Sequence, residues 1–366
     1  MTTRPGLPEP RGEASAAVVH ALETRLPGTV TFRSPRHRNL DALGDDVQLA
    51  LWCCYALHYH GFAGVPDDWE WEPEVLRLRA RLESAFLDRL RDEIGGPRVV
   101  DPRVVPERLD ALATGTGPSL SRVLAARGAF PQMREFLVHR SVYQTKEADP
   151  HTWAIPRVSG AAKAALVEIQ HDEYGAGDPA AVHATLFRST LEWAGVDLDA
   201  IHASGGTIVD HVPASTLVTD NLVSGFGLHR ARRAECLGHL ALFEMTSTGP
   251  MGRYAATLRR LGAPPAARRF YEVHVQADAV HEIVAREMVE RFLADEPGQA
   301  GGVLFGARAL QWAEARFTHA LLDAWAGGGS SLRRPLPHHR VTAPVSSPAV
   351  VSRPGTRPST TVRLVG

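Results

Sequence analysis

The stretch from residue 271 to residue 292 constrains the fold of this chain more than any other feature. It contains no proline or glycine, is rich in alanine, valine and glutamate, and is typical of one continuous helix. At about 100° per residue, His274, Asp278 and His281 fall within an arc of roughly 60° on such a helix. Two imidazoles and one carboxylate therefore project from a single stripe.

This stripe is suited to one half of a metal site, because imidazole and carboxylate ligands together favour iron, manganese or zinc. The alternative is a solvated polar face that carries incidental histidines. Val273, Val280 and Val284 lie along one flank of the stripe. We therefore expect the stripe to face inward, where polar groups without partners are energetically costly.

Helical periodicity also dominates most of the remaining chain. We expect helices at about residues 42–60, 73–94, 118–128, 131–147, 158–174, 179–194, 213–225, 229–247, 250–261, 265–294 and 302–326. Stretches with strand propensity, such as 29–32 and 207–209, are too few for a central sheet. The sequence therefore predicts an all-α bundle with an N-terminal helical extension packed on it.

Composition divides the chain into four segments. Residues 1–30 are predicted to be a flexible N-terminal segment, and residues 31–130 a helical extension. Residues 131–326 form the predicted helical core domain. Residues 327–366 are rich in Gly, Ser, Pro and Arg without periodicity, so they are predicted to be a disordered tail.

Composition also argues against several classes of function. The net charge of -1 arises from 40 basic and 41 acidic residues, so nothing supports binding to nucleic acid. No stretch approaches about 18 uninterrupted apolar residues, and the N-terminus lacks a signal-peptide core, so no membrane association is expected. The cysteines show no CxxC spacing, which favours buried thiols in a cytoplasmic protein. No GxGxxG motif opens a helix after a strand, and no GxSxG motif occurs.

Candidates for the remaining ligands of a metal site lie in the middle of the chain. Glu147 is expected at the end of one helix, Glu173 near the end of the next, and His183 early in the helix after that. The break GAGDP between Glu173 and His183 allows these two residues to converge from successive helices. A competing pair, Glu168 and His171, forms the E-x-x-H unit of ferritin-like bundles, although no second unit occurs. Spacing alone does not decide between the two alternatives, which are the pair Glu168 and His171 or the single residue Glu173.

Residues 131–326 resemble the haem-oxygenase-like diiron oxidases and oxygenases, which are also described as iron-containing redox enzymes. The stretches that carry the resemblance are WAIPRVSGAAKAALVEIQHDEYGAG, GHLALFEMTS, EVHVQADAVHE and VLFGARALQWAEARF. The resemblance implies a haem-oxygenase-like bundle of about seven core helices that binds two iron ions, as Fe(II) or Fe(III), in place of haem. It also implies six ligand positions, and all are filled here, by Glu147, Glu173, His183, His274, Asp278 and His281.

The same resemblance implies how the ligands divide and what the centre does. One iron would be held by Glu147, His183 and His281, and the other by the remaining three ligands, which are Glu173, His274 and Asp278. Such a centre activates O2 to oxidise a small metabolite in secondary metabolism. The expected reactions are N-oxygenation of an amine, or oxidative C–C cleavage or desaturation of an amino-acid-like or fatty-acid-like substrate. No catalytic residue beyond the metal ligands is identified.

The partners expected from the sequence are few. An external electron donor is expected, because no flavin or Fe–S motif is present, and a homodimer is a further expectation. One alternative is a non-catalytic metal-binding bundle or partner protein, and another is a haem-oxygenase-type enzyme, which would need an axial histidine but no carboxylates. A weaker alternative is a hydrolase with Cys236 as nucleophile and His239 beside it, but nothing marks this thiol as activated.

Six further residues are candidates for contact with the ligands or for the substrate pocket, and each has a structural alternative. Glu244 lies in an otherwise apolar helix, where it either supports the ligands or is a surface charge. Arg157 would anchor a substrate carboxylate or form a structural ion pair. The others are expected to be pocket or core residues, and they are Tyr143, Trp153, His171 and Tyr174.

Overall fold

A computed structural model of the chain describes residues 3–32, 40–115 and 117–336. These residues form α-helices joined by turns and short 3₁₀ helices, and no strand occurs among them. The all-α prediction is therefore confirmed. None of the helices in these ranges is both long enough and apolar enough to cross a membrane.

The helices follow one another along the chain with short connections. Their bounds are α1 Glu13–Thr24, α2 Asp45–Ala56, α3 Pro73–Ile94, α4 Val105–Ala113, α5 Leu120–Arg127, α6 Phe130–Gln144, α7 Asp149–Thr152, α8 Gly160–Glu173, α9 His183–Trp193, α10 Leu198–Ala203, α11 Ala214–Gly227, α12 Arg233–Arg260, α13 Pro265–Asp295 and α14 Ala300–Ala326. Most of the helices expected from periodicity are present, with ends shifted by a few residues. The short helices α1, α4, α7 and α10 were not expected.

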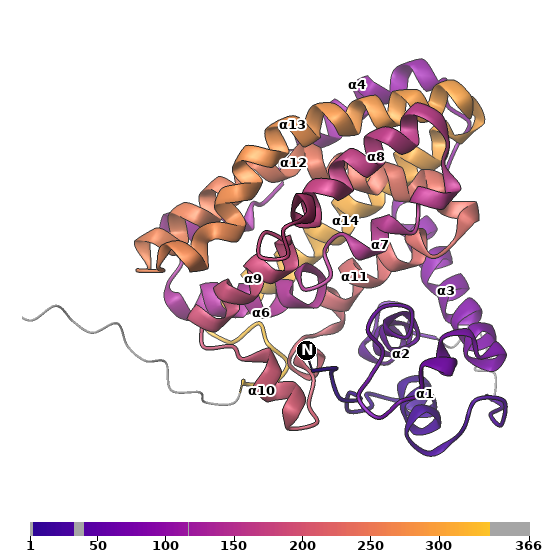
Figure 1. Cartoon of the computed structure of the whole chain (residues 1–366), viewed down its shortest axis with the longest axis vertical. Helices are drawn as coiled ribbons and strands as arrows, with labels where there is room; N and C mark the ends of the chain where they lie inside the picture. Colours follow the sequence, from indigo (N-terminus) through magenta and orange to yellow (C-terminus); the bar gives the residue numbers. More distant parts are fainter. Residues whose placement is uncertain (1–2, 33–39, 116, 337–366) are drawn as a thin grey trace, which may run out of the picture.

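Three long helices, α12, α13 and α14, form the main layer contacts of the bundle, and α12 packs against both of the others. The helices α8 and α9 pack against α13, while α11 packs against α14. Figure 1 shows these helices as an elongated bundle, with α1 and α2 gathered beside one end of it. The contact between α2 and α11 joins this N-terminal group to the bundle.

The helix α12 continues through Pro250, where the sequence predicted a break between two helices. Proline removes one backbone hydrogen bond and crowds the preceding turn, which usually ends or kinks a helix. Here Gly249 and Gly252 flank the ring without side chains of their own. Packing against α13 and α14 along its length holds α12 in one piece despite the lost bond.

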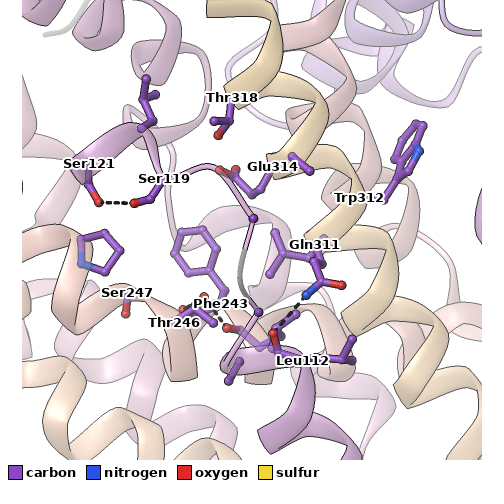
Figure 2. A pocket seen from close by; sticks show the side chains of 18 of the residues that line it. Leu112, Ser119, Ser121, Phe243, Thr246, Ser247, Gln311, Trp312, Glu314 and Thr318 are labelled. Carbon is purple, nitrogen blue, oxygen red and sulfur yellow. Dashed lines mark hydrogen bonds between the residues drawn. The ribbon is translucent and has the colours of Figure 1, made fainter. Parts of the chain in front are cut away.

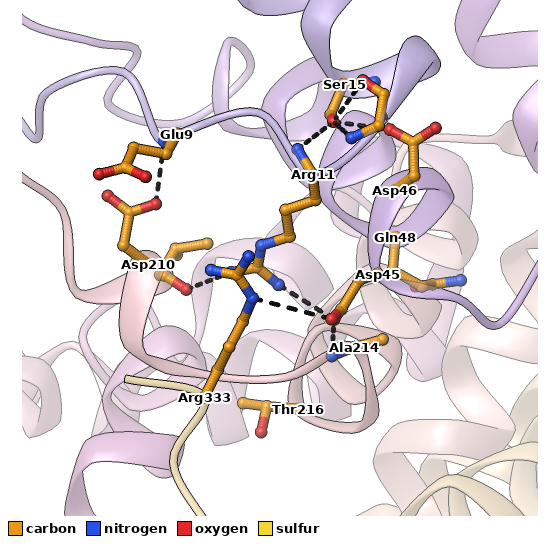
Figure 3. Close-up of polar contacts among 12 residues, drawn as sticks. Glu9, Arg11, Ser15, Asp45, Asp46, Gln48, Asp210, Ala214, Thr216 and Arg333 are labelled. Carbon is orange, nitrogen blue, oxygen red and sulfur yellow. Dashed lines mark hydrogen bonds and ion pairs between the residues drawn. The ribbon is translucent and has the colours of Figure 1, made fainter. Parts of the chain in front are cut away.

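The N-terminal segment, expected to be flexible over residues 1–30, contains helix α1, which buries one face. Two adjacent aspartates at the start of α2 account for this. The carboxylate of Asp46 accepts hydrogen bonds from the backbone N–H groups of Ala14 and Ser15, at 2.9 and 2.7 Å, and so caps α1. Asp45 accepts from the N–H of Ala214 at 2.7 Å and caps α11 (Figure 3). One Asp-Asp pair therefore fixes the N-termini of two other helices.

The chain after α14, which was expected to be disordered from residue 327, packs onto the bundle as far as it is described. Ser331 is buried, and its hydroxyl lies 2.6 Å from Glu135 and 3.0 Å from Nε2 of His139. Arg333 approaches Asp45 at 3.8 Å, beside the buried guanidinium of Arg11 (Figure 3). Residues 337–366 of the predicted tail lie outside the described residues.

Candidate metal centre

The stripe of His274, Asp278 and His281 faces the interior, as expected from the sequence. The three side chains lie on α13 and are almost completely buried, with exposures of 3%, 1% and 1%. The valine flank that suggested this orientation is only partly inward, because Val280 is 54% exposed while Val284 is buried. The stripe is therefore buried by the neighbouring helices α8, α9 and α12 and not by its own valines.

Glu147, Glu173 and His183 also lie in the interior. Glu147 was predicted to be the last residue of a helix, but it lies in a turn, because α6 already ends at Gln144. Glu173 is the last residue of α8 and His183 is the first residue of α9, four residues later than the predicted helix start. Nδ1 of His183 lies 2.8 Å from the carboxylate of Glu173.

The turn between Glu173 and His183 brings these two residues together. Gly175, Ala176 and Gly177 all have positive φ, with values of 73°, 51° and 90°, so the chain reverses sharply after α8. A side chain at position 175 would lie 2.6 Å from the backbone nitrogen of Val182. Glycine is therefore required there, and the prediction that the two ligands converge from successive helices holds.

The alternative pair on α8 is excluded from this cluster. Glu168 and His171 are both exposed to solvent, whereas Glu173 on the same helix is buried. The E-x-x-H unit therefore points away from α13, and Glu173 is the residue of α8 that faces the other ligands.

The buried candidate ligand atoms form two compact groups that share one carboxylate. Glu147, Glu173, His183 and His274 offer atoms that all lie within 4.8 Å of one another. A second group with the same spacing consists of Glu173, Glu244 and His281. This grouping differs from the division that the family resemblance implied, because His281 joins Glu244 and not Glu147.

Glu244 is the ligand candidate that the sequence did not assign to the metal. It lies on α12, is 4% exposed, and its carboxylate is 3.4 Å from Nδ1 of His281. The only sequence signal was a lone carboxylate within an apolar helix. The packing of α12 against α13 places it beside the stripe.

The cluster contains buried polar atoms that are not satisfied by hydrogen bonds within the protein. Both oxygens of Glu147, both oxygens of Asp278 and Nδ1 of His281 are inaccessible and make no hydrogen bond. Asp278 lines the same small pocket as Glu147 and Glu244, and its carboxylate is 4.0 Å from Nδ1 of His281. Orphaned carboxylate oxygens at such depth are costly unless a cation lies among them. These residues therefore fit a metal site.

The electrostatic coupling in the cluster is strong. Burial raises the pKa of Glu244 to about 7, and the nearby carboxylate of Glu173 adds to this rise. Burial alone would lower the pKa of His274, but the carboxylates around it, led by Glu147, raise this pKa to about 10. Without a metal ion, protons on the imidazoles thus balance part of the negative charge, and metal binding must displace them.

Two imidazoles of the stripe are oriented by a hydrogen bond at the ring nitrogen that points away from the cluster of carboxylates. Nδ1 of His274 donates to the carbonyl of Phe270 at 2.7 Å, which leaves Nε2 toward Glu147 at 3.6 Å. Nε2 of His281 lies 3.1 Å from the carboxylate of Asp172, which leaves Nδ1 toward Glu244. Such partners fix the tautomer of a metal-binding histidine and make it a stronger ligand. Nothing in the sequence distinguished Asp172 from other surface aspartates.

Replacing Asp172 by alanine should weaken metal binding at the second group about 10- to 100-fold, because His281 loses the partner that orients it. The first group, which does not contain His281, should keep its affinity. Calorimetric titration with Zn(II) would separate the two binding events. His171→Ala is the matched control, since this neighbour is exposed. Equal weakening of both events, or of neither, would contradict the assigned role.

A cavity of about 740 Å³ adjoins the cluster (Figure 2). Tyr143, Phe243 and Ser247 line both this cavity and the small pocket that is also lined by five of the candidate ligands, which are Glu147, Glu173, Glu244, His274 and Asp278. Residues on either side of the α4–α5 connection, including Leu112 and Ser119, form part of its wall together with the face of α14 that carries Gln311 and Glu314 (Figure 2). The N-terminal extension therefore helps to enclose a space large enough for a small organic molecule.

The tentative pocket residues separate into two sets. Tyr143 does line the cavity, as suggested. Arg157 instead donates to the backbone carbonyls of Gly227 and Leu228, where it caps α11, and it lines neither cavity. Trp153 packs edge-on against His58 and is outside both cavities. Tyr174 is partly exposed, with its hydroxyl bonded to Asp149. His171, as noted, points to solvent and is not the core residue that was expected.

Comparison with known proteins bears on the identity of this bundle. Residues 134–315 match the family model described as iron-containing redox enzyme. Among solved structures, the chain is similar to a domain of unknown function with a heme oxygenase-like fold from Shewanella denitrificans OS217. That likeness has 16% sequence identity and a TM-score of 0.47, and covers 64% of this chain and 96% of the other. No curated protein gives a significant match. Over residues 134–315, this chain belongs to the family of iron-containing redox enzymes.

Proposed function

We propose that this protein is a non-haem diiron enzyme that uses O2 to oxidise a small organic substrate. The observation that carries the proposal is the pair of buried ligand groups that share Glu173, next to a cavity of about 740 Å³. A carboxylate common to both groups is suited to hold two metal ions close together. The family description of the segment supports iron as the metal.

The charges of the site agree with two divalent ions. Four buried carboxylates surround the pocket, from Glu147, Glu173, Glu244 and Asp278, and supply four negative charges when ionised. Two Fe(II) ions supply four positive charges, so the loaded centre would be close to neutral, as a buried site requires. Mixed imidazole and carboxylate ligands are typical of iron sites, whereas structural zinc sites are rich in thiolates. A haem enzyme would gain nothing from four buried carboxylates.

Bound ferrous ions would supply electrons to O2, and the residues of this chain would control where that chemistry acts. Glu173 would contribute to holding both ions, while Asp172 and the carbonyl of Phe270 orient the imidazoles of His281 and His274. Tyr143 and Phe243 form the boundary between the ligands and the cavity, so a substrate there would meet the metals across these rings. An external donor would supply the electrons that return the iron to the ferrous state after each reaction. N-oxygenation and oxidative C–C cleavage or desaturation both remain within this proposal.

A non-catalytic metal-binding bundle is the alternative, and oxygen reactivity separates the two. We expect protein loaded anaerobically with about two Fe(II) per chain to give a transient visible absorption band on mixing with O2, and to consume O2 in proportion to its iron. Protein loaded with redox-inert Zn(II) is the control and should do neither. Tight iron binding without O2 consumption, in the presence and absence of candidate amines and acids, would favour the binding protein.

A further inference from the structure

A second cavity, of about 390 Å³, lies where the N-terminal part of the chain meets the bundle, and the proposed function does not use it. Its wall comes from the first described residues, from α2, from the end of α6, and from α9, α10 and α11. Lys146 lines this cavity, whereas Tyr143 and Gln144 line the large cavity beside the metal ligands. The end of α6 therefore has one of the two cavities on each side, and the two share no lining residue.

The wall of this second cavity carries more positive than negative charge. Its cationic side chains are Arg4, Lys146 and Arg188, and the one carboxylate among the described lining residues is that of Asp220. This carboxylate is buried and already engaged, because Nζ of Lys146 lies 2.5 Å from it. Three positive charges against one negative charge leave the wall with an excess of two positive charges.

Arg188 is the cation in this wall that is least occupied by the protein. Arg4 forms two hydrogen bonds with Asp67, at 2.7 and 3.3 Å. The carboxylate nearest to Arg188 among the described residues is that of Asp199, at 3.6 Å, which is too long for a hydrogen bond. The side chain of Arg188 is 26% exposed and that of Asp199 is 58% exposed, so this contact is weak. The guanidinium of Arg188 therefore has donors available for a ligand.

Two histidines in the wall respond to the positive charge. Loss of solvent around the ring lowers the pKa of His60 to about 4, and the charges of Lys146, His202, Arg188 and Arg4 lower it further. Burial lowers the pKa of His202 as well, and the charge of Arg188 adds to this effect. Both rings are thus neutral at pH 7 and lie in a positive potential, which attracts anions.

Much of the remaining wall is apolar. Its larger side chains are Trp52, Tyr55, Tyr59, Leu198, Ile208 and Val209. The hydroxyl groups of the two tyrosines already donate to Glu83 and Ser224, at 3.0 and 3.1 Å. A volume of about 390 Å³ is sufficient for a small metabolite. A ligand that matches this wall has a compact apolar body and an anionic group.

We propose that this cavity is a second ligand site, which binds a phosphate monoester with an aromatic or other apolar body. The phosphate group would be held by the guanidinium of Arg188, whose planar fork of donors matches phosphate oxygens. A phosphate monoester carries close to two negative charges at pH 7, and these balance the excess charge of the wall. The ligand would lie across α6 from the large cavity, so this inference is independent of the proposed function.

Matched aromatic probes test the chemistry of the site. Phenyl phosphate, benzoate, benzyl alcohol and inorganic phosphate would be titrated calorimetrically into the whole chain, before and after a chelator has removed its metal and has itself been desalted away. We expect phenyl phosphate to bind at least about 10-fold more tightly than any of the other three. Its affinity should be the same with and without metal. Benzoate or inorganic phosphate binding as tightly as phenyl phosphate, or loss of binding on metal removal, would overturn the inference.

Three variants test the location. Arg188→Ala should weaken binding of phenyl phosphate at least about 10-fold, and Arg188→Lys should weaken it less, because lysine keeps the charge but loses the planar fork. Arg269→Ala is the matched control, since this exposed arginine of α13 lies outside the wall. Thr185 lines the cavity and is exposed, so Thr185→Trp should obstruct binding while the helical circular dichroism stays unchanged. Phenyl phosphate binding that either Arg188→Ala or Thr185→Trp leaves unchanged would place its site elsewhere and refute the proposal.

Discussion

Replacing Glu173 by alanine should remove both metal ions from the protein at once. Glu173 is the one residue that belongs to both ligand groups, and its carboxylate also holds His183 at 2.8 Å. Its loss leaves each group without the shared ligand and leaves the remaining buried charges unbalanced. We expect metal content to fall from about two ions per chain to well below one, and O2 consumption to fall at least about 1,000-fold. Metal analysis after desalting and an oxygen electrode would measure these changes.

Two comparison variants make this result specific. Glu168→Ala removes a carboxylate from the same helix but from its exposed face, so metal content should not change. Glu244→Ala removes a ligand from the second group only, so about one ion per chain should remain in the first. If Glu173→Ala retained two ions, or if Glu244→Ala lost both, the shared-carboxylate arrangement would be wrong.

The part of this site that was predictable from the sequence is the part with local spacing. His274, Asp278 and His281 share one face of a helix at fixed intervals, and any straight helix presents them together. The glycine-rich turn allowed Glu173 and His183 to converge, but spacing alone did not separate Glu173 from Glu168, and only the family resemblance favoured Glu173. For these residues the chain itself dictates proximity, and the structure places them in the interior.

The part that was not predictable depends on which helices become neighbours. Glu244 reaches His281 only because α12 packs along α13, and Asp172 reaches it only because α8 lies on the other side. No interval in the sequence encodes either contact. Arg157 and Tyr174 show the opposite error, since nearness to the ligands along the chain did not bring their side chains into the pocket.

The helix ends illustrate the same physical limit. The N-terminus of α1 has no strong capping residue of its own, so its sequence resembles a flexible segment, but Asp46 supplies the missing acceptor from α2. The helix α12 passes through Pro250 because neighbouring helices compensate for the lost hydrogen bond. In both places tertiary contacts outweigh the local preference of the sequence.

The contact between α12 and α14 requires glycine on both helices, and it controls where Glu244 lies. A Cβ atom at Gly238 of α12 would be 1.9 Å from the carbonyl oxygen of Val303. A Cβ atom at Gly306 of α14 would be 1.9 Å from the carbonyl oxygen of Glu235. The two backbones are thus in direct contact, because a backbone carbonyl of each helix packs against a glycine of the other helix. Any side chain there must force the helices apart.

Gly306→Ala should therefore destabilise the protein by about 3 kcal/mol, even though alanine is the better helix former by about 1 kcal/mol. Gly298→Ala is the matched control, because a Cβ atom there meets nothing within 4 Å, and its stability should stay within about 0.5 kcal/mol of the parent. Denaturant unfolding followed by circular dichroism measures both. Separation of the helices also shifts α12, so Gly306→Ala should weaken metal binding at the group containing Glu244 more than at the group containing His183. Unchanged stability in Gly306→Ala would mean that α12 and α14 do not meet backbone to backbone, and the position of Glu244 beside His281 would then lose its structural basis.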